Sequence, residues 1–130
     1  DIVGTIGIFN LKDEDGKKKL FLWLVKRGNI GRRDWDSGEQ SIRQSMEDVG
    51  DTYLASHIAP QHSRLPRKLV VLTNGDFNAA LSLTMSSYLK AWSKRHGAQA
   101  VMVNGSTLAA WSERFLLALL NFKWVALREG

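Results

Sequence analysis

The run Leu20–Val25 constrains the fold more than any other stretch, because six apolar residues follow one another and end on a lysine. The run has no proline or glycine and is rich in large side chains, which predicts a buried strand. Side chains alternate along a strand, so Leu24 and Lys26 share one face. We therefore expect Lys26 at the carboxyl end of a buried strand, where its ammonium needs an anion. That anion is either a structural carboxylate or a substrate phosphate.

Composition narrows the class of protein. A chain of 130 residues, 44% hydrophobic and 24% charged, is expected to form one globular domain over residues 1–130. No apolar run reaches the length of a membrane span, and the absence of cysteine excludes a thiolate metal site and agrees with a cytoplasmic location. The net charge of +5 agrees with a polyanionic partner. Because the sequence opens on Asp1 and not on methionine, we expect a domain cut from a longer chain.

A hairpin is predicted at the start of the chain. Residues 1–11 alternate with a period of two, and Asp15-Gly16 separates them from the second strand, residues 18–27. Asp-Gly tolerates the positive φ of a tight hairpin turn, so the two strands should be antiparallel. The open ends of such a hairpin meet, which would make Asp1 and Lys26 neighbours.

The rest of the chain alternates helices and strands. The loop of residues 28–37 holds Trp35, which looks exposed; it could wedge against DNA or fold back on the core. Ser37 and Gln40 have the spacing of a capping box, and a helix with an apolar stripe follows them. Two more strands, residues 68–73 and 98–103, each end at Asn-Gly; helices are expected from Asp76 to Gly97 and from Ser106 or Thr107 onward. The pattern predicts an α/β fold with a mixed sheet, in which the antiparallel hairpin is extended by parallel βαβ strands and helices cover both faces.

The order of these motifs resembles the restriction-endonuclease-like nucleases of the PD-(D/E)xK superfamily. An acidic residue opens one strand, and Val25-Lys26 closes the antiparallel next strand. Leu72-Thr-Asn-Gly-Asp-Phe-Asn-Ala-Ala80 and Val103-Asn-Gly-Ser-Thr-Leu108 are similar to the later turns of the Mrr-like branch, the type IV restriction enzymes. The resemblance runs in order along nearly all 130 residues.

The resemblance implies a restriction-endonuclease-like core and cleavage of double-stranded DNA in the presence of Mg²⁺ or Mn²⁺. It implies that Asp1 and the backbone carbonyl of Val25 hold the metal and that Lys26 assists the attacking water. The domain would be the nuclease part of a restriction or phage-defence protein, with any homo-oligomer formed through that parent protein. Arg27, Arg32 and Arg33 could form a rim that binds DNA phosphates, although a solvated surface explains them equally well.

Leu24 departs from the family pattern, which has Glu or Gln at this position. Three explanations stay open. The ligand has moved to Glu39, Gln40 or Gln44; the domain has lost catalysis and is a degenerate DNA- or protein-binding module; or Leu24 is an engineered change. Lys26 could also form a structural ion pair with Asp1, and a Rossmann-like nucleotide-binding domain is a third class of function, although no G-x-G-x-x-G motif supports it.

Overall fold

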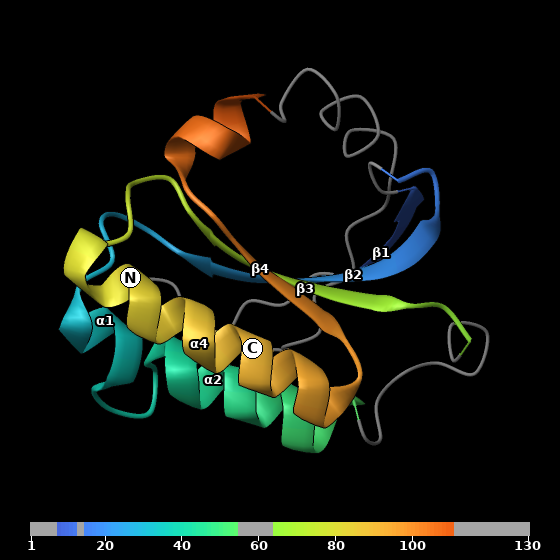
Figure 1. The fold of residues 1–130 in the computed structure, drawn as a ribbon, viewed down its shortest axis with the longest axis horizontal. Coiled ribbons are helices and arrows are strands. Elements are labelled where there is room, and N and C mark those ends of the chain that lie inside the picture. Colours follow the sequence, from blue (N-terminus) through green and yellow to red (C-terminus); the bar gives the residue numbers. More distant parts are fainter. Residues whose placement is uncertain (1–7, 13–14, 55–63, 111–130) are drawn as a thin grey trace, which may run out of the picture.

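The computed structural model describes residues 8–12, 15–54 and 64–110. Four strands form one sheet in the order β1-β2-β3-β4 (Figure 1). Their bounds are Ile8–Lys12 for β1, Lys18–Lys26 for β2, Arg67–Thr73 for β3 and Gln99–Val103 for β4. Strand β1 pairs antiparallel with β2, whereas β3 pairs parallel with both β2 and β4.

The expected mixed α/β class is confirmed, with three parallel strands and helices. The first strand, predicted for residues 1–11, is described only over β1, where Ile8 pairs with Leu22 and Lys12 with Lys18. Residues 1–7 and the turn residues 13 and 14 fall outside the described ranges. The complete hairpin and the restriction-endonuclease-like core therefore stay predictions.

One face of the sheet is covered by helices α1 (Arg32–Asp36), α2 (Ile42–Asp48) and α4 (Ala79–His96), as Figure 1 shows. A π-helical turn, η1 (Val49–Tyr53), continues α2. Residues 105–110 are helical too, and Leu108 packs against the opposite face. Within the described parts of the chain, no helix combines the length and the apolar character needed to cross a membrane.

Strand β2 is buried on both sides, as its apolar run predicts. Leu22 and Leu24 belong to the core beneath the helices, together with Ile42 of α2 and Trp92 of α4. Phe21, Trp23, Val70 and Val103 form the second cluster on the other face of the sheet. Each such side chain contributes about 1.5–3 kcal/mol when fully buried, so β2 anchors both layers of the core.

Three local expectations are wrong. Residues 32–36, expected in a loop, form α1, and Trp35 is only 2% exposed, with its ring centroid 5.2 Å from that of Tyr88. Ser41, not Ser37, caps α2 by accepting from the Gln44 N–H at 3.2 Å. Asn78, not Asp76, caps α4 by accepting from the N–H of Ala80. The expected end of α4 is confirmed, since Gly97 adopts a left-handed conformation with φ of 63°.

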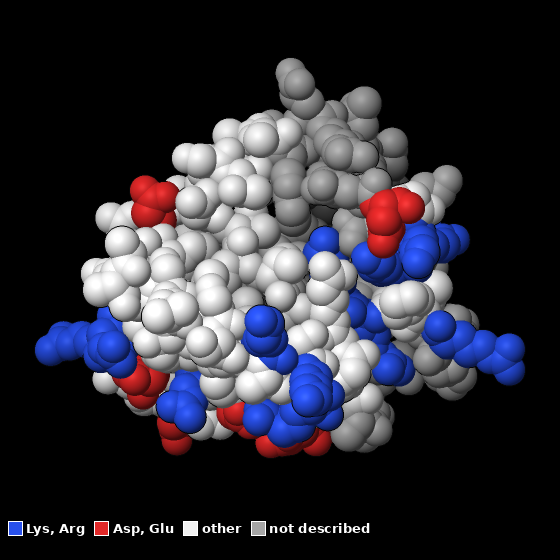
Figure 2. All heavy atoms as spheres, in the orientation of Figure 1, with Lys and Arg blue, Asp and Glu red and all other residues white. Residues whose placement is uncertain are grey.

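Charges are distributed unevenly over the surface. On the face shown in Figure 2, Lys and Arg side chains gather at the right-hand end, with one acidic group among them. This end corresponds to the start of β2 and β3 and to the end of α4 in Figure 1. Acidic and basic groups are mixed along the lower edge of the same view.

The packing of α4 on η1 depends on the absence of a side chain at Gly50. A Cβ atom built there would come within 2.5 Å of Cε1 of His96. The imidazole of His96 is only 12% exposed, and its ring centroid lies 4.9 Å from that of Trp92. The ring therefore has little room to move away from an added methyl group.

We expect Gly50→Ala to lower the free energy of unfolding by about 1–3 kcal/mol, because overpacking of a filled site costs that much. In a His96→Ala background the same change should be neutral or stabilising, since alanine is the better helix former by up to about 1 kcal/mol. Urea denaturation of the four proteins gives the coupling. An equal loss in both backgrounds would show that His96 is not the obstacle.

Candidate functional site

Lys26 is the last residue of β2, and it lies opposite Thr73, the last residue of β3, in the parallel register. The carboxyl ends of parallel strands share one edge of the sheet, and ligands of open α/β sheets bind outside that edge. The Lys26 side chain is 13% exposed, so most of its surface is covered by neighbouring residues. Leu24, two residues earlier, is 1% exposed and belongs to the apolar core.

Asp34 is the described partner of Lys26, and sequence reasoning missed it. Its Oδ1 atom lies 3.7 Å from Nζ of Lys26. Its Oδ2 atom accepts a hydrogen bond of 2.9 Å from the N–H of Gly31, which precedes α1. One carboxylate thus caps a helix and faces the lysine. The signal in the sequence was an acidic residue three positions after Gly31, a spacing typical of a helix start.

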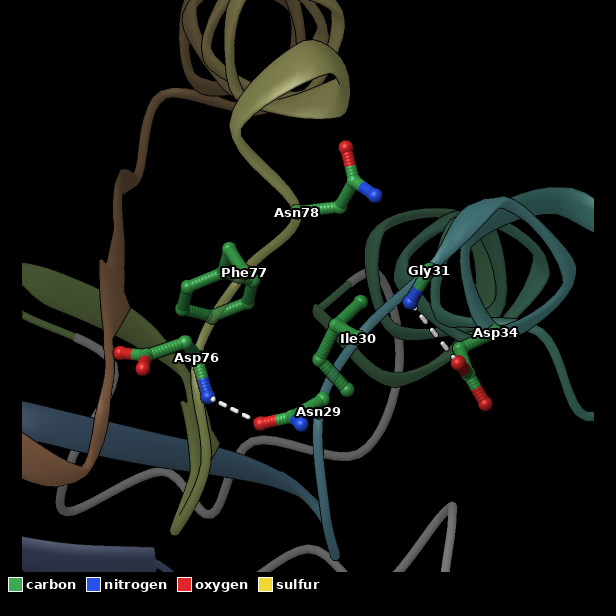
Figure 3. A pocket seen from close by; sticks show the side chains of 7 residues that line it. All are labelled: Asn29, Ile30, Gly31, Asp34, Asp76, Phe77 and Asn78. Carbon is green, nitrogen blue, oxygen red and sulfur yellow. Dashed lines mark hydrogen bonds between the residues drawn. The ribbon is translucent and has the colours of Figure 1, made fainter.

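Hydrogen bonds tie the loop after β2 to the loop after β3. The Thr73 hydroxyl donates to the carbonyl of Gly28 and accepts from the N–H of Gly75 at 3.1 Å. In return, the Gly28 N–H donates to Oδ1 of Asn74 at 2.8 Å. The N–H of Asp76, in the loop after β3, donates to Oδ1 of Asn29 at 2.9 Å (Figure 3). Thr73 is fully buried, and the two hydrogen bonds of its hydroxyl are partly shielded from water, whereas the two that involve the asparagine side chains are exposed. The loop that follows Lys26 is therefore held in place by its neighbour.

The loop after β4 joins the same network. The Gly105 N–H donates to the carbonyl of Gly75 at 2.9 Å, and the Asn104 side chain donates to Asp76 at 3.3 Å. A Cβ atom on Gly75 would lie 2.7 Å from the carbonyl carbon of Gly28, and one on Gly105 would overlap the carbonyl oxygen of Asn74. Both Asn-Gly pairs therefore permit close approach of backbones, in addition to ending the strands.

A hollow of about 480 Å³ opens beside this network. It is lined by residues from the loops after β2 and β3 and from α1, namely Asn29, Ile30, Gly31, Asp34, Asp76, Phe77 and Asn78. Figure 3 shows that the carboxylates of Asp34 and Asp76 lie on opposite sides of the hollow and point away from each other. They do not form a paired-carboxylate site.

The site residues that the sequence predicts lie in different places in the structure. Lys26 is at the strand end as expected, and Val25, whose carbonyl was the expected ligand, precedes it within β2. Arg27, Arg32 and Arg33 are exposed near this edge, and Nη1 of Arg32 lies 3.6 Å from a carboxylate oxygen of Asp36. Asp1, the expected metal ligand, is outside the part of the chain that the structure describes.

The candidates for a displaced ligand lie before or within α2. Glu39 and Gln40 are exposed in the turn that precedes it. The side-chain amide of Gln44 donates to Oδ1 of Asp48 at 3.1 Å, which is a contact within the same helix. These observations give no support to a ligand that has moved to α2.

The described residues do not fit a Mg²⁺ site. Mg²⁺ demands octahedral coordination by oxygen atoms, usually from one or two carboxylates together with waters and phosphates. Asp34 already receives a hydrogen bond on one oxygen and faces Lys26 with the other, and Leu24 offers no ligand. No group of three or more His, Asp or Glu side chains in the described ranges could hold a metal ion.

Comparisons of the chain with family models, with curated proteins and with solved structures find no match.

We expect Thr73→Val to loosen the loop after Lys26. The isosteric change removes the hydroxyl and leaves the Gly28 carbonyl and the Gly75 N–H without this partner, which costs about 1–3 kcal/mol of unfolding free energy. Thr73→Ser keeps the hydroxyl and should recover most of the loss. Guanidinium denaturation and amide hydrogen exchange of residues 28–31 measure both effects. Equal stability of the valine and serine variants would contradict the role of this hydroxyl.

Proposed function

We propose that the chain is a DNA-binding domain of restriction-endonuclease-like fold, in which Lys26 and the neighbouring arginines contact phosphates of duplex DNA. The observation that carries the proposal is the position of Lys26, whose side chain is 13% exposed, at the carboxyl edge of the parallel strands. An ammonium attracts anions, and this edge is where open α/β sheets bind ligands.

The contact between Lys26 and Asp34 is a loose ion pair, so it does not saturate the ammonium of Lys26. Its N–O distance of 3.7 Å exceeds the 2.7–2.9 Å typical of a charge-assisted hydrogen bond. Arg27 and Arg33 are exposed nearby and can add phosphate contacts. Phosphate contacts position a protein on DNA without reading its sequence, so the proposal specifies a duplex but no recognition sequence.

Binding without cleavage is favoured by Leu24. A residue buried among Leu22, Ile42 and Trp92 belongs to the core, and a glutamate there would bring a carboxylate into apolar surroundings. Together with the poor fit of the described residues to Mg²⁺, this supports a catalytically degenerate module of the nuclease fold, which binds DNA without cutting it.

Mg²⁺- or Mn²⁺-dependent cleavage of DNA is the second candidate function. It is favoured by the position of Lys26 directly after Val25 at the end of β2, where the resembled family has its catalytic lysine. It depends on Asp1, of whose placement nothing is described. A role within a cytoplasmic restriction or phage-defence protein, and oligomerisation through that protein, follow from the resemblance alone.

Exposed arginines near the site should contribute to DNA affinity in a salt-dependent way. For duplex binding, a plot of log K against log salt concentration should flatten by about 0.9 for each phosphate contact that is lost. Replacing Arg32 and Arg33 together by alanine should therefore flatten the slope and weaken binding. Fluorescence anisotropy with a labelled 24-base-pair duplex, about two helical turns long, measures both quantities.

Arg43→Ala is the matched control, because Arg43 is exposed on α2, where its guanidinium lies 5.3 Å from the centre of the Tyr88 ring. It should leave the slope unchanged. Undetectable duplex binding by the unmodified protein at 50 mM salt would remove the proposed function.

A plasmid-nicking assay distinguishes DNA binding alone from metal-dependent cleavage. We expect the unmodified protein and Lys26→Ala to nick supercoiled plasmid equally little in 10 mM Mg²⁺ or Mn²⁺, because the described residues offer too few free oxygen ligands for the metal. Lys26→Ala should at the same time weaken duplex binding. Metal-dependent nicking that Lys26→Ala abolishes would establish the nuclease and replace the binding module.

A further inference from the structure

The amino edge of the sheet, opposite to Lys26, carries an excess of positive charge. Residues 15–19, 64–68 and 90–94 together hold eight basic side chains and one acidic side chain, Asp15. Asp13 and Glu14, which are outside the described ranges, add two acidic residues in the sequence. Figure 2 shows the resulting concentration of Lys and Arg at one end of the molecule.

The carboxyl edge is balanced by comparison. Residues 26–39 and 73–78 carry four basic and four acidic side chains. Two of the basic ones have a carboxylate within 4 Å, since Lys26 faces Asp34 at 3.7 Å and Arg32 faces Asp36 at 3.6 Å. The long-range attraction for a polyanion therefore comes from the amino edge and not from the edge with Lys26.

The basic residues of the amino edge form one continuous surface. Nζ of Lys19 lies 3.3 Å from the side-chain oxygen of Gln99, the first residue of β4. Gln99 lines a hollow of about 570 Å³ between β4 and α4, together with Lys90 and Lys94. On the other side, the Leu20 N–H donates to the carbonyl of Pro66 at 2.8 Å, which brings residues 64–68 beside residues 17–19.

We propose that this amino edge is a second DNA-binding surface, which holds the phosphate backbone of a duplex through Lys17, Lys18, Arg64, Lys90 and Lys94. All five side chains are exposed. The proposal rests on the proposed function, since the same duplex is the partner, but it assigns most of the electrostatic affinity to a surface remote from Lys26.

The chemistry of the surface favours the backbone of a duplex over other polyanions. Ser86 and Ser93 line the hollow beside the two lysines, and hydroxyl and ammonium groups are common phosphate contacts. Stacking of single-stranded bases and insertion into a membrane both need exposed aromatic or large apolar side chains. Among the described residues the large hydrophobic side chain that is exposed is Leu83, which does not line the hollow.

The distance between the two edges suits one turn of DNA. Strand β2 runs from Lys18 to Lys26, eight residue steps, which span about 26 Å at about 3.3 Å per residue. With extended side chains at both ends the reach approaches the roughly 34–36 Å of one helical turn. One strand of a duplex can therefore present phosphates to both edges.

The test uses two double variants of exposed lysines in the duplex-binding assay with the 24-base-pair probe. Lys17→Gln with Lys18→Gln, and Lys90→Gln with Lys94→Gln, should each flatten the log–log salt slope by up to about 1.8, two contacts at about 0.9 each. The quadruple variant should lose at least tenfold in affinity at 100 mM salt. Arg43→Gln, elsewhere on the surface, should change neither quantity. Circular dichroism and urea midpoints check that each variant is folded.

The outcomes separate this inference from the proposed function. If the unmodified protein binds the duplex and the quadruple variant keeps its slope, the amino edge is not a DNA surface, while binding near Lys26 stands. If the salt slope flattens in the quadruple variant but not in Arg32→Ala with Arg33→Ala, the result supports the amino edge and contradicts phosphate contacts near Lys26. An unmodified protein that binds no duplex but binds an acidic protein partner overturns both.

Discussion

The parallel pairing of β2 with β3 is the constraint on which the rest of the structure depends. It sets Lys26 beside Thr73, so that the Thr73 hydroxyl reaches the Gly28 carbonyl and ties down the loop that follows the lysine. A shift of the register by one residue would turn every side chain of β2 to the other face of the sheet. Leu24 would then move from the core beneath the helices to the cluster on the other face of the sheet, and Lys26 would lose Asp34, so the register that places Leu24 also places the site.

The buried strands β2 and β3 could be predicted from the sequence because each has an unambiguous apolar pattern and a clear end. Strands β2 and β3 match the expected ranges to within one residue, since a buried run meets Arg27 in one case and Asn74 in the other. The caps of α2 and α4 could not be chosen, because two competent cap residues stand close together at each helix start. For α4, tertiary contacts select the cap. The Ile30 N–H donates to the Asp76 carbonyl at 2.8 Å, and the Asn78 N–H donates to the Ile30 carbonyl at 2.9 Å, which places Asn78 at the helix start.

The candidate site was predictable in its lysine but not in its partner. Asp34 stands in a short polar stretch around Trp35, which has the composition of an exposed loop. In the fold the stretch is a helix whose Trp35 packs against Tyr88, 53 positions later in the sequence, and no local pattern reports that contact. For Leu24, the sequence suggested a functional change where the fold shows an ordinary core residue. Beside a family motif it looks like a missing ligand, whereas in the fold it is one of the most buried residues of the core.

The two edges of the sheet differ in their balance of basic and acidic side chains. Attraction of DNA by the amino edge would therefore depend on other groups than any chemistry at Lys26. Electrostatic interactions between exposed groups fade over about 8 Å at physiological salt, far less than the roughly 26 Å that separates Lys18 from Lys26. Each edge can therefore change without altering the ionic balance of the other. If the proposed function holds, a domain that lacks a metal ligand at position 24 would still hold DNA through its amino edge, because the exposed lysines and arginine of that edge do not depend on Leu24 or Lys26. A change at one edge would then leave the phosphate contacts of the other edge in place.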